Sequence, residues 1–430
     1  MSLLLATYRT ATALAAPLIA QHLRGRLKRG KEDAARFAER LGQPGRERPD
    51  GPLAWVHAAS VGESLTMMPL IEALTARHPG LNVLVTSGTV TSAGLLAERL
   101  PPGTLHQYVP VDRTPYVTAF LDHWRPDLAL WAESEFWPNL LTLTEARGIP
   151  MALINGRVSP ESFAKWRRWP GLARTLIGCF RLCLAQAERD AERLRALGAK
   201  NVVAAGNLKF AVPPLPAADE AVAELDGALD GRPRWLAAST HPGEEEMIWA
   251  AHAIAAERHP GLITIIVPRH PERGPAVAAE LEALGATVAR RGAGQPIAAG
   301  TQVYVADTIG EMGLFFRTAP VSFMGKSLVD LGGQNPIEPA RLGSAILFGP
   351  HMWNFPDVTD ELVAADAAET VENPAELGAR VAALLADEDL RKSRAERALA
   401  CADAHAAVLG HVLGHLEPMI ADALRAGAAP

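Results

Sequence analysis

The fold is decided by one stretch, Gly325-Lys326-Ser327-Leu328-Val329-Asp330-Leu331-Gly332-Gly333-Gln334-Asn335-Pro336-Ile337-Glu338-Pro339-Ala340. The apolar run 319–324 before it predicts a buried strand. Glycines let the backbone approach a ligand closely, and Pro336 suits the first turn of a helix. Glu338 would lie in that turn, where exposed amides favour anions. A strand, a glycine loop and a helix start are typical of a phosphate or nucleotide site, although an ordinary βα connection gives the same pattern.

The same alternation of apolar strands and helical segments runs through the rest of the chain. Strands are predicted at residues 53–58, 81–86, 126–131, 149–155 and 181–185, and again at 235–238, 262–267, 303–306, 319–324 and 345–348. Helical segments follow many of them, and an Ala-rich helical tail closes the chain from residue 376 to about 426. This order predicts parallel sheets covered by helices on both faces. Ligand groups are then expected at the carboxyl ends of the strands.

Length and composition predict two or three globular units and no nucleic-acid partner. The chain has 430 residues, 48% of them hydrophobic and 21% charged, with a formal net charge of −6. A single core rarely extends over so many residues. No global basic field favours nucleic acid. The three cysteines, Cys179, Cys183 and Cys401, give no disulfide framework, which predicts a cytosol-facing protein.

The N-terminal segment is apolar and is followed by a basic collar. Arg9 is the one charged residue before Arg24, and residues 24–31 carry five cations before the first acid, Glu32. The uncharged run 10–23 is shorter than the roughly 20 residues of a spanning helix. No cleavage site for a signal peptide follows it. We expect either a helix lying in a membrane interface or a helix docked on the protein with solvated charges.

A linker is expected where the composition of the sequence changes, because residues 213–216 are Pro-Pro-Leu-Pro. The predicted organisation is a membrane-associating helix at 1–32, an α/β domain at 33–206, the linker at 207–232, a second α/β domain at 233–386 and closing helices at 387–430. Two such α/β halves with facing strand ends form a cleft, which is a usual place for a ligand.

Carboxylates follow two of the predicted strands of the first half. Glu63 lies at a strand end where a helix starts, and it is either a first-turn acid or a general base that removes a proton from a hydroxyl. Glu133 and Glu135 hold the equivalent point after a later strand. If these two open a helix, they point to nearly opposite sides, so that only one faces the cleft. The neighbouring Trp131, Phe136 and Trp137 either desolvate a carboxylate or stack on a sugar, or are plain core, and the core interpretation is favoured.

Three further places in the sequence carry arginine, lysine or histidine side chains that are candidate site residues. Prolines on both sides of Arg269-His270 fix the backbone, as a bidentate phosphate grip by Arg269 requires, although a solvated turn gives the same pattern. Lys209, at the domain junction, is either a charge-balancing cation or plainly exposed. His411 and His415 are four apart without a third placed ligand, which favours a plain helix face over a metal site.

Several motifs occur together in one order along the chain. They are Ala58-Ala59-Ser60-Val61-Gly62-Glu63-Ser64, Glu133-Ser134-Glu135-Phe136-Trp137-Pro138-Asn139-Leu140, Asn155-Gly156-Arg157-Val158-Ser159, Gly206-Asn207-Leu208-Lys209-Phe210, the runs 268–273, 307–312 and 332–340, and Gly349-Pro350-His351 with Asn354-Phe355. In this order they resemble the 3-deoxy-D-manno-octulosonic acid (Kdo) transferases of lipopolysaccharide assembly.

The resemblance implies the GT-B architecture of two Rossmann-like domains and an inverting glycosyltransferase on the cytoplasmic side of the inner membrane. CMP-Kdo is the implied donor and the lipid A precursor lipid IVA the implied acceptor, with no cofactor and no metal. Glu63 is the implied base, and Glu133 and Lys209 stabilise the transition state. The implied nucleotide contacts are Pro268, Arg269, Gly310, Glu311, Met312, Asn335, Pro336, Ile337 and Glu338.

Three positions depart from the common pattern of that family. Gln334 stands where a histidine is frequent, Gly156 where alanine is common, and Lys326 where a small residue is common. They bear on fine specificity, and an extra cation at Lys326 would lie beside the nucleotide loop. Two other functions stay open: another GT-B nucleotide-sugar enzyme, such as a lipid-linked N-acetylglucosaminyltransferase or a 2-epimerase, and a non-catalytic sugar-nucleotide sensor.

Overall fold

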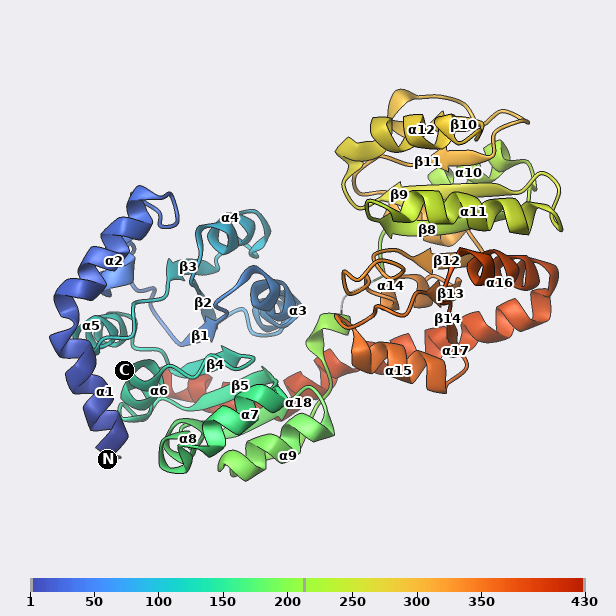
Figure 1. The fold of residues 1–430 in the computed structure, drawn as a ribbon. Helices are drawn as coiled ribbons and strands as arrows, with labels where there is room; N and C mark the ends of the chain where they lie inside the picture. The colour runs from blue at the N-terminus through green and yellow to red at the C-terminus, as the bar shows by residue number, and fades with distance from the viewer. Residues whose placement is uncertain (1–2, 212–213, 428–430) are drawn as a thin grey trace. The chain divides into compact units, whose positions relative to one another are not determined.

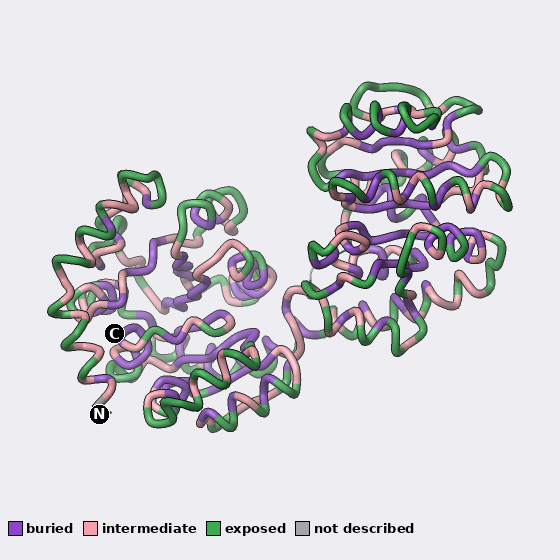
Figure 2. Tube along the Cα trace, viewed as in Figure 1, coloured by how far each residue is buried: buried purple, intermediate pink, exposed green. Residues whose placement is uncertain are grey.

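The computed structural model describes residues 3–211 and 214–427 (Figure 1). The chain divides into two compact units. The first unit comprises residues 1–212 and 407–430, and the second comprises residues 213–406. Each unit is an α/β structure built on one parallel seven-stranded sheet. Figure 2 shows that the strands of both units are buried while the outer faces of the helices are exposed.

The sheet of the first unit has the strand order β3-β2-β1-β4-β5-β6-β7. Its strands are β1 (Leu53–His57), β2 (Asn82–Ser87), β3 (Leu105–Tyr108), β4 (Leu128–Ala132), β5 (Met151–Gly156), β6 (Leu182–Ala185) and β7 (Val202–Ala204). Its helical elements are α1 (Leu3–Leu14), α2 (Ala16–Lys28), η1 (Phe37–Leu41), α3 (Val61–Arg77), α4 (Val90–Arg99), α5 (Thr114–Trp124), α6 (Pro138–Glu145), α7 (Pro160–Arg167), α8 (Pro170–Ile177), α9 (Glu188–Leu197), η2 (Leu208–Phe210) and α18 (Val408–Gly427). The order of the strands reverses between β1 and β4, so that a crevice is expected at their carboxyl ends.

Alternation along β1 sends side chains into two cores. Ala54 and Val56 belong to one buried cluster, together with residues of α3 and α18 such as Leu416. Trp55 belongs to the cluster on the opposite face, together with Phe120 of α5. Successive side chains of a strand point to opposite faces, which explains why a continuously apolar strand needs helices on both sides.

The sheet of the second unit has the order β10-β11-β9-β8-β12-β13-β14, and every recorded pair in it is parallel. Its strands are β8 (Arg234–Thr240), β9 (Ile263–Pro268), β10 (Val288–Arg290), β11 (Val303–Val305), β12 (Val321–Met324), β13 (Ala345–Phe348) and β14 (Ala368–Thr370). Its helical elements are α10 (Asp219–Leu229), α11 (Glu244–Ala256), η3 (Pro271–Arg273), α12 (Gly274–Ala283), η4 (Arg291–Ala293), α13 (Met312–Thr318), α14 (Ile337–Ala340), α15 (Pro356–Ala364), α16 (Pro374–Ala386) and α17 (Glu388–Ala406). The α/β class predicted from the sequence is confirmed.

All the predicted strands are present, and their ends lie within two residues of the predicted ones. The structure adds the short edge strands β3, β7, β10 and β14. The expected linker 207–232 contains η2 and α10. The expected closing segment 387–430 is divided, because α17 belongs to the second unit and α18 to the first.

The N-terminal helices pack on the first unit through polar contacts. The Tyr8 hydroxyl donates to Asp112 Oδ2 over 2.9 Å, and Arg9 donates to Asn139 Oδ1 over 3.2 Å. Leu14 and Leu18 point to solvent and are 78% and 69% exposed. No helix among residues 3–427 is both long enough and apolar enough to cross a membrane.

Candidate active site

Glu63 is fixed at the start of α3 by a reciprocal cap. Ser60 is the N-cap, and its Oγ accepts a hydrogen bond from the Glu63 N–H over 3.3 Å. The Glu63 carboxylate reaches back, where Oε2 accepts from the Ala59 N–H over 2.7 Å and Oε1 accepts from the Ser60 hydroxyl over 3.1 Å. This arrangement closely resembles a capping box, a local signal that the serine three residues before Glu63 already carries. Glu63 is half-buried, so that one carboxylate both caps the helix and stays accessible.

Glu133 lies directly after β4, the strand that pairs with β1. Its backbone is in the left-handed region, with φ at 52°, and its N–H donates to the Ile154 carbonyl over 2.9 Å. Lys209 Nζ lies 3.5 Å from Glu133 Oε1. A left-handed non-glycine residue is uncommon and costs energy, and such positions often occur at functional sites.

Asn155, at the end of β5, holds the segment that carries Lys209, and no separate role was predicted for it from the sequence. Its φ is 55°, and its Oδ1 accepts from the Leu208 N–H over 2.9 Å. Asn207 then caps η2 by accepting from the Lys209 N–H over 3.0 Å. Asparagine tolerates the left-handed region better than most residues, so that the Asn155-Gly156 pair after an apolar run is the signal that marks this position.

Three carboxylates therefore gather at the carboxyl end of the sheet. Burial raises the pKa of Glu63, and the negative charges of Glu133 and Glu135 raise it further, while the hydrogen bonds from Ala59 and Ser60 act against them. Glu133 and Glu135 do not open a helix, because α6 begins only at Pro138. Both carboxylates can then act on Glu63. The arrangement suits a general base, which needs a pKa above that of an ordinary glutamate.

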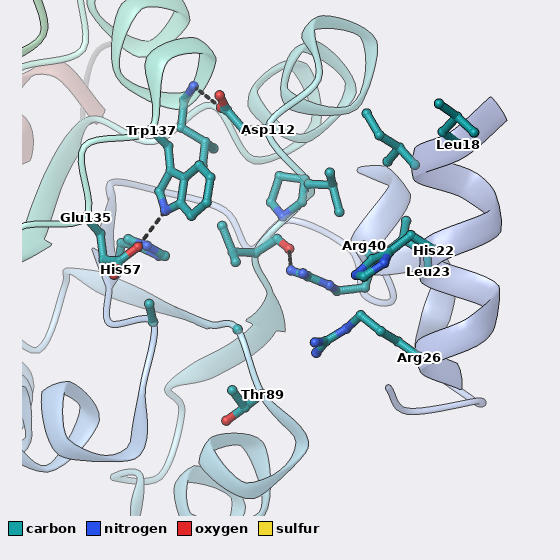
Figure 3. A pocket seen from close by; sticks show the side chains of 17 residues that line it. Leu18, His22, Leu23, Arg26, Arg40, His57, Thr89, Asp112, Glu135 and Trp137 are labelled. Carbon is teal, nitrogen blue, oxygen red and sulfur yellow. Dashed lines mark hydrogen bonds between the residues drawn. The ribbon is translucent and has the colours of Figure 1, made fainter. Parts of the chain in front are cut away.

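Glu135, one of these carboxylates, lines a cavity of about 760 Å³ (Figure 3). Its walls come from α2, from the ends of β1 and β3 and from the start of α6. The lining residues are Leu18, Ile19, His22, Leu23, Arg26, Arg40, His57, Ala59, Gly88, Thr89, Val109, Pro110, Val111, Asp112, Glu135, Trp137 and Leu140. Most of them are apolar, Arg26 and Arg40 add positive charge, and Asp112 and Glu135 add negative charge. Trp137 is 44% exposed and donates to Glu135 Oε2 over 2.6 Å, so that the interpretation of Trp137 as core is wrong, whereas Trp131 and Phe136 are buried.

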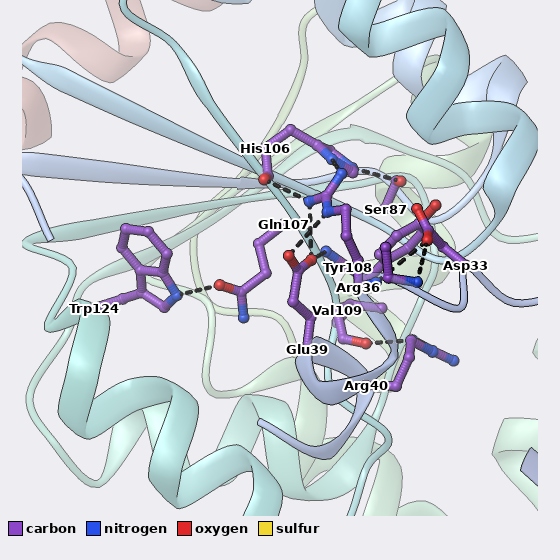
Figure 4. A network of polar contacts seen from close by, with 11 residues as sticks. Asp33, Arg36, Glu39, Arg40, Ser87, His106, Gln107, Tyr108, Val109 and Trp124 are labelled. Atoms are coloured by element: carbon purple, nitrogen blue, oxygen red, sulfur yellow. Dashed lines mark hydrogen bonds and ion pairs between the residues drawn. The ribbon is translucent and has the colours of Figure 1, made fainter. Parts of the chain in front are cut away.

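A polar network holds one wall of this cavity against β3 (Figure 4). Arg36 donates to the Glu39 carboxylate and, over 2.8 Å, to the His106 carbonyl. Glu39 Oε2 accepts from the Tyr108 N–H over 2.8 Å, and Arg40 donates to the Val109 carbonyl. The segment between α2 and β1 is thereby fixed, which leaves the cavity open rather than collapsed.

His57, at the end of β1, is fully buried beside the cavity. Its Nδ1 lies 3.0 Å from Thr86 Oγ1, which accepts from the Trp55 indole N–H over 2.8 Å. Its Nε2 has no hydrogen-bond partner among the described residues. Burial lowers the pKa of His57 to about 3, with a further contribution from Arg40. The ring is therefore neutral at physiological pH.

In the second unit, the predicted nucleotide contacts fall into two groups. Pro268 ends β9 and Arg269 follows it. Burial raises the pKa of Glu338, while its hydrogen bond with Asn335 and the charge of Arg269 act against this rise. Asn335 accepts from the Ile337 N–H over 3.1 Å, and Pro336 is the N-cap of the single turn α14.

The other group lies around α13. Gly310 has φ at 85°, Glu311 is the N-cap and Met312 the first helical residue. Glu311 pairs with Arg291, whose Nε donates over 2.7 Å, and the Thr308 hydroxyl also donates to it. Glu311 lines a separate cavity of about 580 Å³ together with Tyr304. Its carboxylate is therefore already engaged by protein groups.

The glycine loop does not offer the amides that its sequence suggested. The N–H groups of Lys326, Ser327 and Leu328 all donate to the carboxylate of Glu244, which is fully buried. An acidic side chain thus occupies the place where the sequence pattern predicted a ligand anion.

The chain is similar in sequence to known proteins of one family. The family described as 3-deoxy-D-manno-octulosonic-acid transferase (kdotransferase) matches residues 35–212. A 3-deoxy-D-manno-octulosonic acid transferase of Bordetella pertussis is 37% identical over 418 residues, which cover 94% of this chain and 96% of the relative. A probable mitochondrial 3-deoxy-D-manno-octulosonic acid transferase of Arabidopsis thaliana is 35% identical, with 81% and 80% covered.

Solved structures share the fold at lower identity. A UDP-GlcNAc 2-epimerase from Neisseria meningitidis bound to UDP-GlcNAc is similar with a TM-score of 0.56 and 14% identity, and the match covers 84% of this chain and all of that one. At this identity the likeness concerns the fold alone.

Proposed function

Because the chain belongs to the 3-deoxy-D-manno-octulosonic acid (Kdo) transferase family, we propose that it moves Kdo from CMP-Kdo to lipid IVA, the lipid A precursor. The observation that carries this proposal is the half-buried carboxylate of Glu63, whose pKa is raised by burial and by two neighbouring carboxylates.

The proposed step is a single displacement. A hydroxyl oxygen of the acceptor forms a bond to the anomeric carbon of Kdo, and the bond from that carbon to the phosphate oxygen of CMP breaks. The hydroxyl proton passes to the Glu63 carboxylate, and the bonding electrons leave with CMP. Attack from the side opposite the leaving group inverts the anomeric centre. A partly buried carboxylate suits the role of base, since burial keeps its pKa high.

Glu133 and Lys209 are proposed to stabilise the charge that develops in this step. Their 3.5 Å ion pair and the left-handed backbone of Glu133 hold both charges at fixed positions beside Glu63. Charges fixed before the reaction need no reorganisation during it. We therefore expect transfer to continue in the presence of EDTA, as a reaction that uses no metal requires.

The cavity supports an acylated and phosphorylated acceptor. Apolar side chains such as Leu23, Val111 and Leu140 can bury hydrocarbon, and Arg26 and Arg40 lie at the same cavity. Arg26 and Arg40 share one acidic partner, Glu32, at 2.6 and 3.3 Å, while Asp112 and Glu135 line the same cavity. The two guanidinium groups are the groups in this cavity that suit a phosphate, and the apolar walls suit acyl chains.

The N-terminal helices are proposed to rest on the cytoplasmic face of the inner membrane. Leu14 and Leu18 are exposed next to the basic segment that ends α2. An apolar surface beside cations is the chemistry that binds an anionic lipid interface. Sedimentation with vesicles containing phosphatidylglycerol should capture the wild type and should capture a Leu14→Ser/Leu18→Ser double variant much less.

The transfer itself is tested with CMP-Kdo generated in situ and the tetra-acylated lipid A precursor, with products read by mass spectrometry. A mass increase of one or more Kdo units is expected, and UDP-GlcNAc should give no product. Folded protein that binds CMP but gives no product would favour a different acceptor or a sensor. Protein that binds UDP in preference to CMP would favour another GT-B enzyme.

A further inference from the structure

The second unit contains a buried carboxylate that lies where a bound anion would otherwise be expected. Glu244 is the first residue of α11, directly after Gly243, whose φ of 92° turns the chain from β8 into the helix. Its side chain is fully buried. Oε2 accepts from the N–H groups of Lys326 over 2.6 Å and His241 over 2.9 Å. Oε1 accepts from Ser327 over 3.0 Å and Leu328 over 3.2 Å.

These contacts fix the conformation of the glycine loop. Three consecutive N–H groups can converge on one carboxylate because Lys326 has φ at 64°, in the left-handed region. Gly325 allows the loop to lie against β8, since a Cβ there would approach the Ser239 carbonyl oxygen to 2.6 Å. Ser327 ties the other end, because its Oγ accepts from the Gly349 N–H over 2.7 Å. The loop is therefore built around Glu244 rather than around a ligand.

Because three loop amides donate to Glu244, side chains are the groups at this loop that are left to bind a ligand. The charges of Lys326, His270, Arg269 and Arg273 lower the pKa of His241, after the larger effect of burial, so that all four lie near this ring. Arg273 is held by Glu245 at 2.8 Å.

The other two cations have no such restraint. Among the described residues, neither Lys326 nor Arg269 forms an ion pair within 4.0 Å of a carboxylate. Gln334 Nε2 lies 3.3 Å from His241 Nε2 and therefore donates to it. Two cations with no carboxylate within ion-pair distance, next to a neutral imidazole, favour an anionic ligand.

We propose that Glu244 is a positioning residue that fills the amide nest of the donor loop, and that the donor phosphate is bound by side chains, with Lys326 as a phosphate-binding residue beside Arg269. This inference rests on the proposed function, because it takes the phosphate to be that of CMP-Kdo. The proposal explains why position 326 carries a lysine, although its left-handed backbone would favour glycine.

The phosphate-binding role is tested by comparing CMP with cytidine in calorimetry. Wild-type protein should bind CMP more tightly than cytidine, and Lys326→Met should lower the affinity for CMP about tenfold without changing that for cytidine. A lysine with only a structural role would change both affinities together. An unchanged ratio of CMP to cytidine affinity in Lys326→Met would overturn this assignment.

The positioning role is tested with Glu244→Gln and with Glu246→Gln as the matched control. Both variants remove one acid from the first turn of α11, but Glu246 is exposed, whereas Glu244 is buried and accepts from the loop amides. The amide nitrogen of glutamine cannot accept from the loop amides. Hydrogen exchange at residues 326–328 should become at least tenfold faster in Glu244→Gln and should be unchanged in Glu246→Gln.

Donor kinetics give the second readout. In Glu244→Gln the KM for CMP-Kdo should rise about tenfold with kcat nearly unchanged, because the loop contributes to binding rather than to chemistry. Wild-type exchange rates and wild-type KM in this variant would overturn the positioning role. If the variant does not fold, Lys326→Met still decides the phosphate contact. If wild-type protein binds no CMP, the proposed donor is wrong, while the exchange rates still support or overturn the role of Glu244.

Discussion

The dual position of Glu63 leads to a prediction that separates catalysis from stability. Its carboxylate accepts from the Ala59 N–H over 2.7 Å as part of the cap of α3, and it is also the proposed base. Replacement by alanine removes both roles. Replacement by glutamine removes only the base, because the amide oxygen can still accept from Ala59 and the amide nitrogen can donate to Ser60. Glu72→Gln, in the exposed part of α3, is the matched control for the loss of one acid.

The magnitudes follow from these contacts. Loss of a general base typically lowers the rate by 10²- to 10⁴-fold, which corresponds to about 3–5 kcal/mol of barrier. Loss of a helix cap costs about 1 kcal/mol of folding free energy. Both variants of Glu63 should therefore lose at least about 100-fold in kcat. In urea unfolding, Glu63→Ala should be less stable by about 1 kcal/mol and Glu63→Gln by less than about 0.5 kcal/mol.

The pH profile gives an independent check. Burial and the charges of Glu133 and Glu135 raise the pKa of Glu63, and the base works only when ionised. Activity should therefore be lost, as pH falls, at a pH above about 4.3, the value of an ordinary glutamate. The assay is the transfer reaction with kcat/KM measured against pH, together with CMP calorimetry to confirm that donor binding is intact. Near-normal turnover by Glu63→Gln would refute the assignment of the base.

Four other substitutions test the remaining assignments. Arg269→Ala should weaken CMP binding by about 2 kcal/mol in calorimetry, typical of a lost charged hydrogen bond, and unchanged affinity would make Arg269 structural. Lys209→Met should lower kcat by roughly 100-fold at constant KM for CMP-Kdo. In a double-mutant cycle with Glu133→Gln, the free-energy losses of the two substitutions should not be additive. Strictly additive losses would show that Lys209 and Glu133 do not share one role. His57, with its pKa lowered to about 3, should make folding less stable as pH falls from about 6.5 to 3, by on the order of 5 kcal/mol, because only the unfolded chain takes up the proton there. His57→Gln should flatten this slope in urea unfolding at several pH values, and an unaltered slope would show that His57 is not the titrating group.

Much of the architecture could be predicted because it is encoded locally. Runs such as 53–58 and 345–348 are apolar and bounded by turn residues, so that each strand is visible within a few positions. The acids at Glu63 and Glu133 stand directly after such runs, and a parallel sheet gathers its carboxyl ends on one edge. The order of the motifs also indicated the family. These features depend on spacing along the chain, which the sequence contains in full.

Other features depend on contacts between distant segments. The edge strands β7 and β10 have three residues each, too few to show a period. The helical tail reads as one segment, yet α18 joins the first unit because its apolar residues complete the core around Ala54 and Val56. Which sheet a helix covers is decided by the surface left open there, and no local pattern carries that information.

The glycine loop illustrates the same division most sharply. Residues 319–340 correctly predicted a strand, a tight loop and a helix start, because an apolar run, glycines that allow a tight turn and a proline that suits a first helical turn are local signals. The sequence could not indicate that the loop amides belong to Glu244, more than eighty residues earlier in the chain. A backbone N–H binds whichever acceptor the fold brings within reach, so that only the tertiary structure decided that this acceptor is a buried glutamate and that side chains are left to face the ligand.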